Sequence, residues 1–190
     1  MPNWVKNKVR AVNKEDAAKL IAMLVKDGPH GKVTNFNGII PMPEELLNTV
    51  DGTAPDHQKK MAENKAKYGY GSWYDFACNN WGTKWDNNIV TINGGVIEFE
   101  TAWDYPEGIY RKISETIPII VAYADEAIGF NYGIKEYHED GESDIEIAGE
   151  DRAIANAIWG YTYDPDDECS NADDYDSEVQ SEVDDIIYNR

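Results

Sequence analysis

The sequence predicts an α+β protein, in which helices are mixed with strands. Two observations indicate this class. Two apolar, β-branched segments flank Asn93-Gly94-Gly95, a pattern typical of a β-hairpin. Elsewhere apolar residues recur at helical spacing, beginning with Ala17, Leu20 and Ile21. The chain has 190 residues, of which 42% are hydrophobic and 12% aromatic, so it can form the core of one domain, or of one domain with an appendage.

The first half of the chain divides at glycine and proline residues. Asn13 is a plausible N-cap and Gly28-Pro29 a stop, which together delimit a helix. The elements expected in this half are a strand over 4–12, a helix over 13–27, an extended segment over 32–40, a short helix over 44–48, and helices over 54–68 and 73–81.

The second half begins with the two hairpin strands. From Pro106 onward Ile109, Ile113, Ile117, Ile120 and Val121 indicate the buried stripe of a helix, which Pro118 should kink or divide. The other elements expected are strands over 89–92, 96–103, 129–137 and 144–147, a strand or helix over 153–159, an extended 161–163, a solvated loop over 164–176 and an amphipathic helix over 179–187.

Charge is the most uneven property of the sequence. The chain carries 36 acidic and 17 basic residues, a net charge of −19 and a pI near 4.3. Residues 1–124 hold 15 acids and 14 bases, whereas residues 125–190 hold 21 acids and 3 bases. Nearly all the excess charge therefore lies in the last third. Such a field repels nucleic acid and anionic membranes, so we expect neither as a direct partner.

The residues offer no recognisable catalytic set. His30, His57 and His138 are too dispersed for a zinc site, and no nucleophile elbow or phosphate-binding glycine loop is present. Cys78 is expected to be a core thiol, and two cysteines cannot build a disulfide framework. We expect no enzyme activity and no cofactor. Weak binding of divalent ions by the acids and a carboxylate-pair glycosidase stay open.

Two further expectations concern the cellular location and the role of the tryptophans. No apolar run reaches the length of a membrane span and the N-terminus lacks the apolar region of a signal peptide, so a cytoplasmic protein is expected. Trp73, Trp81, Trp85 and Trp103 could stack on bases, but a core cluster is the preferred interpretation.

Four segments in order carry a resemblance to a known family. They are residues 2–7, residues 36–46 (Phe-Asn-Gly-Ile-Ile-Pro-Met-Pro-Glu-Glu-Leu), residues 73–86 ending Asn-Trp-Gly-Thr-Lys-Trp-Asp, and residues 99–103. Together they resemble YubB-type proteins of plasmids and phages, over roughly residues 1–135. The resemblance implies a ferredoxin-like antiparallel sheet with helices packed on one face, and no established activity. The acidic C-terminal third is where the chain is expected to depart from this family.

These observations lead to a hypothesis of nucleic-acid mimicry. Carboxylates on one helix face are about 5–6 Å apart, and alternate acids of a strand about 6.5–7 Å apart; both spacings are comparable to those of phosphates along a DNA strand. The protein would occupy the basic nucleic-acid-binding groove of a host defence protein, a CRISPR effector or a restriction enzyme. The candidate contact residues are Asp144, Glu146, Asp166, Asp167, Glu168, Asp173, Asp174, Asp176, Glu178, Glu182, Asp184 and Asp185.

Two alternatives and two structural expectations accompany this hypothesis. The acidic surface could serve solubility alone, on a ferredoxin-like protein of housekeeping or enzymatic role. We expect a ferredoxin-like domain over residues 1–163 and an acidic loop with an amphipathic helix over 164–190. The apolar face of that helix, formed by Val179, Val183, Ile186 and Ile187, could pack on its own domain, on a target or on a second copy as a homodimer contact.

Overall fold

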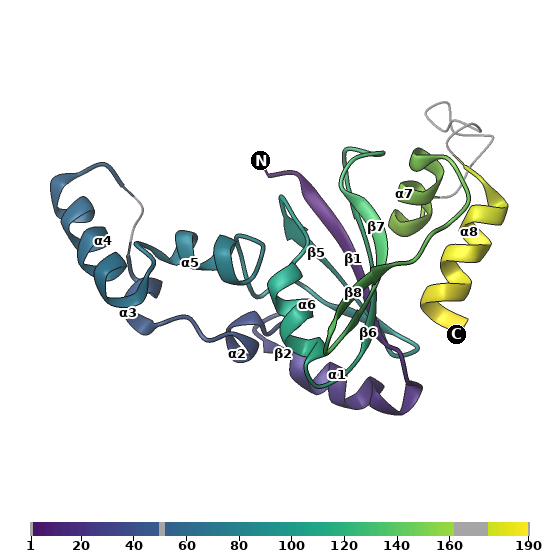
Figure 1. Ribbon diagram of the computed structural model, residues 1–190, viewed down its shortest axis with the longest axis horizontal. Helices are drawn as coiled ribbons and strands as arrows, with labels where there is room; N and C mark the ends of the chain where they lie inside the picture. The colour runs from purple at the N-terminus through teal and green to yellow at the C-terminus, as the bar shows by residue number, and fades with distance from the viewer. Residues whose placement is uncertain (1, 50–51, 162–174, 190) are drawn as a thin grey trace.

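The computed structural model describes residues 2–49, 52–161 and 175–189. It contains a six-stranded antiparallel sheet in the order β4-β5-β1-β6-β7-β8, flanked by helices (Figure 1). The strands are β1 (Trp4–Ala11), β4 (Thr91–Asn93), β5 (Val96–Ala102), β6 (Ile119–Asp125), β7 (Tyr132–His138) and β8 (Gly141–Asp144). The α+β class and the antiparallel sheet expected from the sequence are confirmed.

Strand β1 occupies the middle of the sheet. It pairs with β5 on one side and β6 on the other, so that Val9 lies opposite both Ile97 and Val121. Because β1 is antiparallel to both neighbours, β5 and β6 are parallel to each other, and helix α6 (Glu107–Ser114) connects them. This split β-α-β arrangement is a characteristic unit of ferredoxin-like folds.

The main core lies on one face of the sheet. Alternation along β1 directs Val5 and Val9 to this face, where they join side chains from α1 (Ala17–Leu24), α6 and the segments between them. Leu20 and Ile113 are fully buried here. The 3₁₀ turn Lys14–Asp16 precedes α1.

A second core lies on the opposite face, under α7 (Asp151–Trp159) and α8 (Ser177–Asp184), which continues as a π-helical turn over Asp185–Asn189. Figure 1 shows the sheet between α1 and α6 on one side and α8 on the other. The family resemblance implied helices on one face of the sheet only, and the last helix was expected to belong to an appendage. Instead α7 and α8 cover the second face, and α8 is part of its core.

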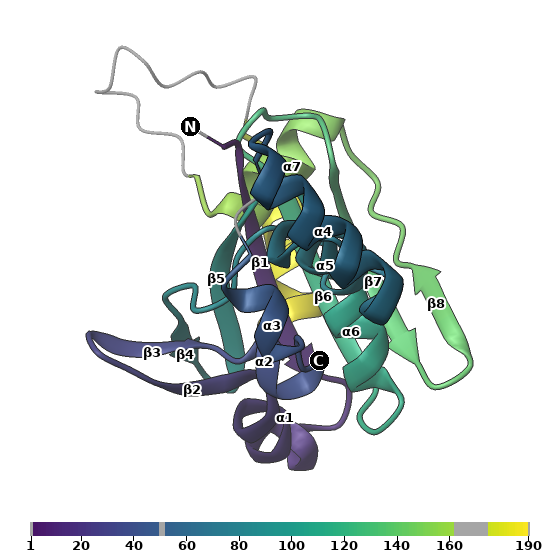
Figure 2. The same ribbon diagram turned by 90° about the vertical axis from the view of Figure 1, so that its left-hand side faces the viewer.

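A long insertion separates α1 from the β4–β5 hairpin. It contains the two-stranded sheet β2 (Val25–Gly28) and β3 (Gly31–Thr34), followed by α2 (Phe36–Ile39), α3 (Glu44–Leu47), α4 (Pro55–Tyr68) and α5 (Trp73–Asn80). Helices α3 and α4 form an arm that extends away from the sheet (Figure 1), and the β2–β3 hairpin projects separately (Figure 2).

Two boundaries in the insertion differ from expectation. The helix expected over 13–27 ends at Leu24, because Val25 pairs with Thr34 in the β2–β3 hairpin. The extended segment expected over 32–40 becomes helix α2 after Asn35. There the N–H groups of Phe36 and Asn37 donate to the carboxylate of Asp86, which stabilises the start of a helix.

The helix expected across Pro118 is also corrected. Helix α6 ends at Ser114, and the residues after Pro118 form β6. Ile120 and Val121 therefore belong to a strand that pairs with β1, and not to the stripe of Ile109 and Ile113. Proline cannot donate a backbone hydrogen bond, so it ends the helical register, and the apolar, β-branched run that follows suits a strand buried on both faces.

Two segments further along the chain can also be compared with expectation. The strand expected over 144–147 lies earlier in the chain, because β8 covers Gly141–Asp144. The alternation nevertheless predicted the exposure of the side chains correctly: Asp144 and Glu146 are exposed, and Ile145 and Ile147 are half-buried. Residues 153–159, left open between strand and helix, are helical in α7. Of the loop expected over 164–176, residues 164–174 lie outside the described residues, as do residues 162–163.

Candidate functional site

The C-terminal helix is fixed to the sheet by its apolar face. Val179 is 2% exposed, Val183 and Ile187 are 0% exposed and Ile186 is 1% exposed, all within this single chain. The homodimer contact expected through these four side chains is therefore corrected: they pack on their own domain, in the second core. Burial of side chains of this size stabilises a fold by about 1.5–3 kcal/mol each.

Basic residues of β1 and of the 3₁₀ turn after it hold the end of this helix. Alternation places Lys6, Lys8 and Arg10 on the face of the sheet that α8 covers. The Arg10 Nε atom donates to the carbonyl of Ile186 at 2.7 Å, and Lys14 Nζ donates to that of Asn189 at 3.3 Å. Cations at the C-terminal end of a helix interact favourably with its dipole, so these contacts orient α8 as well as anchor it.

Lys8 is enclosed at the same junction. Its ammonium lies 5.4 Å from the centre of the Tyr188 ring, and burial lowers the pKa of Lys8 although Glu98 and Asp184 raise it. The hydroxyl of Tyr188 donates to Glu98 at 2.8 Å, and Lys6 forms an ion pair with Glu98 at 3.3 Å. The carboxylate of Asp184 is thus partly balanced by a buried cation.

Residues 145–150, here called the acidic strap, run from β8 to α7 and lie against the first turn of α8. A Cβ atom built on Gly149 would come within 2.6 Å of Val179 Cγ2, so any larger residue would force the strap and Val179 apart. The strap carries Glu146 and Glu150, both exposed, and Glu146 lines an open groove together with Asp144 and Asp151. The strap therefore lies against the start of α8 at Gly149 and Val179, and three of the acids from 144–151 line one groove.

Several of the predicted contact acids have structural partners. Asp144 pairs with Lys135 of the neighbouring strand at 2.9 Å. Asp176 is the N-cap of α8 and accepts from the N–H groups of Glu178 and Val179. Asp184 likewise lies near a cation, Lys8. Asp144, Asp176 and Asp184 therefore offer a partner less uncompensated negative charge than the sequence alone indicated.

The remaining predicted acids fall into two groups. Glu146 and Glu178 are exposed and Glu182 is half-buried; among the described residues no cation lies within ion-pair distance of these three. Asp185 is not without a partner, since it takes part in another interaction. Asp166, Asp167, Glu168, Asp173 and Asp174 lie outside the described residues.

The sequence reasoning did not single out the acids at the start of α7. Glu150 is its N-cap, and Asp151 accepts a 2.5 Å hydrogen bond from the Tyr132 hydroxyl, which raises the pKa of Tyr132 to about 12. A Glu-Asp pair before an apolar helical run is the signal that could have found them.

Signs of metal or nucleophilic chemistry are few in the part of the chain that the structure describes. No group of three or more His, Cys, Asp or Glu side chains there could hold a metal ion. Burial raises the pKa of Cys78, the opposite of what activates a thiol. Within the same residues no helix is both long and apolar enough to cross a membrane.

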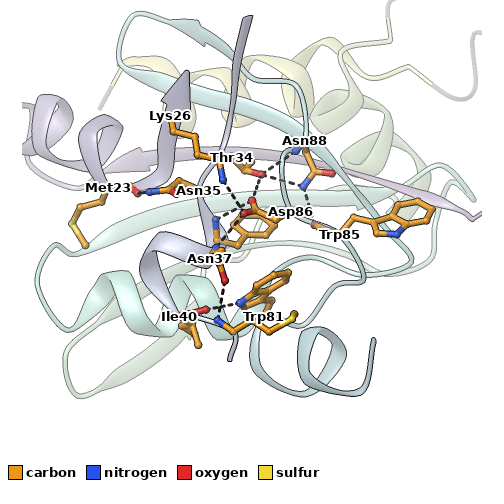
Figure 3. Close-up of polar contacts among 12 residues, drawn as sticks. Met23, Lys26, Thr34, Asn35, Asn37, Ile40, Trp81, Trp85, Asp86 and Asn88 are labelled. Atoms are coloured by element: carbon orange, nitrogen blue, oxygen red, sulfur yellow. Dashed lines mark hydrogen bonds and ion pairs between the residues drawn. The ribbon is translucent and has the colours of Figure 1, made fainter. Parts of the chain in front are cut away.

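A second group of residues, also missed as a unit, centres on the Asp86 side chain, which is 6% exposed (Figure 3). One oxygen, Oδ1, accepts from the Thr34 hydroxyl and the Phe36 N–H, each at 2.9 Å. The other, Oδ2, accepts from the Asn37 N–H at 3.1 Å and from Lys26 Nζ at 3.2 Å. With four donors the carboxylate is satisfied, so its role is to position the loop that contains it.

That loop, residues 81–88, carries an aromatic surface. Trp81 is buried and its indole N–H donates to the carbonyl of Ile40 (Figure 3), so it belongs to the core as expected. Trp85 and Trp103, in contrast, are 36% and 45% exposed. The expectation of one buried tryptophan cluster is therefore wrong for these two residues.

Comparison with known proteins identifies a family. A family model described as a ferredoxin-like domain in Api92-like protein matches residues 80–180, just over half of the chain. No curated protein and no solved structure matches the chain. The matched span includes strands β4 to β8 with α6 and α7, and ends at Gln180 within α8. The departure expected of the acidic third concerned the YubB-type pattern, which this match does not test; most of the acidic third lies inside the matched domain.

Proposed function

We propose that this chain, which belongs to the family of ferredoxin-like domains in Api92-like protein, is a non-enzymatic binding protein whose carboxylates occupy a positively charged groove in place of nucleic-acid phosphates. The target class we infer is a host defence complex that binds nucleic acid, a CRISPR effector or a restriction enzyme. In this proposal the protein is of phage or plasmid type and acts in the cytoplasm of the host cell.

The proposal is carried by the rigid attachment of α8 and the acidic strap to the same core. Val183 and Ile187 are 0% exposed, and Gly149 lies against Val179, so both segments have fixed positions. A mimic needs such fixed charges because mobile side chains lose conformational entropy when they bind. Exposed Glu146 and Glu178 provide charges on this scaffold.

Electrostatics supply the driving force of this interaction. A groove that binds nucleic acid gains affinity by releasing counterions when its Lys and Arg residues contact phosphates, and an anionic protein surface can use the same gain. Opposite charges also steer the two proteins together, an effect that weakens as ionic strength rises. Binding is therefore expected to be lost at high salt and to be competed by DNA or RNA.

The experiment compares three forms of the full chain as immobilised bait in lysate of a bacterial host. The first is the natural sequence. The second is the triple variant Glu146→Gln, Glu178→Gln and Glu182→Gln. The third, matched control removes three charges from the arm instead, with Glu44→Gln, Asp56→Asn and Glu63→Gln, all at exposed positions. Captured proteins are eluted with duplex DNA and identified.

The proposal predicts capture of a nucleic-acid-binding protein by the natural chain and by the arm variant, with loss in the strap-and-helix variant. Equal capture by all three forms would show that the named acids are not the contact. Equal loss in both variants would show that only total charge matters. Absence of any specific partner would favour the alternative, an acidic surface that serves solubility.

A further inference from the structure

A row of aromatic rings with one lysine in its middle lies far along the chain from the acidic strap. Lys84 Nζ is 4.5 Å from the ring centre of Trp85 and 4.7 Å from that of Trp103. Beyond them Trp4 lies 6.1 Å from Trp85, and Tyr74 lies 6.1 Å from Trp103, measured between ring centres. The rings come from β1, the 81–88 loop, the end of β5 and α5, and we call them the aromatic row.

Two rings of this row, those of Trp85 and Trp103, lie at the surface, and the backbone of Trp103 is strained. Trp103 has φ of +72°, a left-handed conformation that is a genuine outlier for a bulky residue and costs of order 1–3 kcal/mol. Its N–H donates to the carbonyl of Asn3 at 2.8 Å, which fixes the strained backbone beside Trp4. The indole is nonetheless 45% exposed. Strain that keeps an apolar ring in water calls for an explanation beyond folding.

The scaffold under the row is rigid. Asp86 fixes the loop through its four donors, and the Thr83 hydroxyl donates to the carbonyl of Ala102 next to Trp103 at 2.9 Å. Gly82 passes so close to the start of α6 that a Cβ atom there would lie 2.9 Å from the Glu107 nitrogen. Preorganisation of this kind reduces the entropy lost when a ligand binds.

An open groove lined by both polar and apolar side chains continues from the row at Trp4. Its polar lining includes Lys6, Asn87, Asn88, Glu98 and Glu100. Amides and carboxylates next to an aromatic face are groups that hydrogen-bond to hydroxyls, since they offer both donors and acceptors. Asn87, like Trp103, has a positive φ, of 62°.

The charges near the row argue against an anionic ligand. Lys84 and Lys6 are the cations, and Lys6 is already paired with Glu98. Glu100 and Asp104 are exposed acids close by in the sequence of β5 and its end. Single-stranded nucleic acid requires a positively charged groove along its backbone in addition to stacking rings. This surface has the rings without the groove of positive charge.

We propose that the aromatic row and the adjoining groove form a binding site for a neutral oligosaccharide. The C–H face of a pyranose ring is apolar and carries slight positive charge, so it suits the negative face of an indole. Stacking on Trp85 and Trp103 would place ring hydroxyls near Lys84, Asn87 and Asn88 as hydrogen-bond partners. This inference does not depend on the proposed function, because neither the strap nor the exposed acids of α8 line the groove, although Glu98 of the groove accepts from Tyr188 at the end of that helix.

The test is titration of the full chain with cellohexaose, chitohexaose and maltohexaose at millimolar concentration, followed by tryptophan fluorescence and calorimetry. An oligothymidylate serves as the competing class of ligand. The variants are Trp85→Ala and Trp103→Gly, the second chosen because glycine accepts the positive φ. Phe130→Ala is the matched control, since it removes an aromatic ring that is 73% exposed elsewhere.

The proposal predicts saturable binding of at least one hexasaccharide, weakened about ten-fold or more by each tryptophan variant and unchanged by Phe130→Ala. Thermal unfolding of the variants, compared with the natural chain, confirms that each is folded. Failure of all three sugars to bind would overturn the proposal, as would equal binding by the tryptophan variants. Preferential binding of the oligothymidylate would overturn it in favour of base stacking.

Discussion

At the scale of single residues, Asp86 connects three parts of the insertion. Its two oxygens accept from Lys26 in β2, from Thr34 in β3 and from the first two N–H groups of α2. A buried carboxylate is favourable only when its lone pairs are occupied, and here four donors occupy them. The residue therefore organises the hairpin, α2 and the loop that presents Trp85.

Replacement of this carboxylate is the residue-scale prediction. Asp86→Ala leaves buried donors without an acceptor, each at about 1–3 kcal/mol, so we expect a loss of roughly 2–4 kcal/mol in the free energy of unfolding. Urea titration measures it. The matched control is Asp27→Ala, which removes the same charge from the exposed Asp27–Lys32 pair of the same hairpin and should cost less than about 1 kcal/mol. Equal effects of the two substitutions would contradict this role.

The same scale shows why the acids of the candidate site were only partly predictable. Composition located the excess charge in the last third, and the alternation of Asp144 and Glu146 correctly placed both at the surface. Their pairing depends on distant residues: Asp144 meets Lys135 only because β7 and β8 pair in one register. That register is a property of the folded sheet and not of either segment alone.

At the scale of elements, the local pattern of apolar residues predicted most strands and helices. It failed where an apolar run is compatible with either a helix or a strand. Val25 fits the stripe of α1, but its pairing with Thr34 decides for a strand. Ile120 and Val121 fit the stripe of α6, but their pairing with β1 decides for β6. In both cases a contact distant in sequence outweighs helical spacing.

Helix α8 is the element on which the proposed function rests. Its amphipathic pattern was evident, but the surface that its apolar face covers was not, because that surface is assembled from β1, β6 and α7. Arg10 and Lys14 show the same limit: their partners are backbone carbonyls more than 170 residues away in sequence. No local signal identifies such partners.

The element-scale prediction is the loss of stability when α8 loses a buried side chain. Ile187→Ala creates a cavity at a position that is 0% exposed, so we expect about 2–5 kcal/mol of destabilisation in urea titration. The exposed control Ser181→Ala should stay within about 0.5 kcal/mol. Sedimentation mass should be the same for both. A change of oligomeric state with Ile187→Ala and no change of stability would contradict burial within the chain.

At the scale of the whole molecule, buried tyrosines set the behaviour at high pH. Burial raises the pKa of Tyr110, Tyr123 and Tyr137, which lie together between α6 and the sheet. Unfolded tyrosine ionises near pH 10. Above that pH the unfolded chain loses protons that the folded chain keeps, so these groups contribute stability that is present below about pH 10 and lost as pH rises further.

Alkaline unfolding is therefore predicted. The free energy of unfolding should fall above pH 10 by about 1.4 kcal/mol per pH unit for each tyrosine that stays protonated in the fold. Lys8, whose pKa burial lowers, acts in the opposite direction below pH 10.5. Absorbance at the tyrosinate band should show a late group of tyrosines that ionise together with loss of circular dichroism. Complete ionisation near pH 10 in a still folded protein would contradict this expectation.

The molecule as a whole separates its charge from its other features. The arm and the aromatic row belong to the nearly neutral first 124 residues, and the acids of the strap and α8 belong to the strongly anionic remainder. The two proposals therefore concern different residues: acids of the anionic remainder for a cationic partner, and rings of the first 124 residues for a neutral ligand.

The most direct test of the mimicry claim measures displacement of nucleic acid. A captured partner is loaded with fluorescent duplex DNA, and anisotropy is followed as the natural chain is added at increasing salt. The account predicts release of the duplex at low salt, loss of this activity as salt rises, and failure of the variant with Glu146→Gln, Glu178→Gln and Glu182→Gln while the arm variant still acts. Simultaneous binding of chain and duplex to the partner would contradict it.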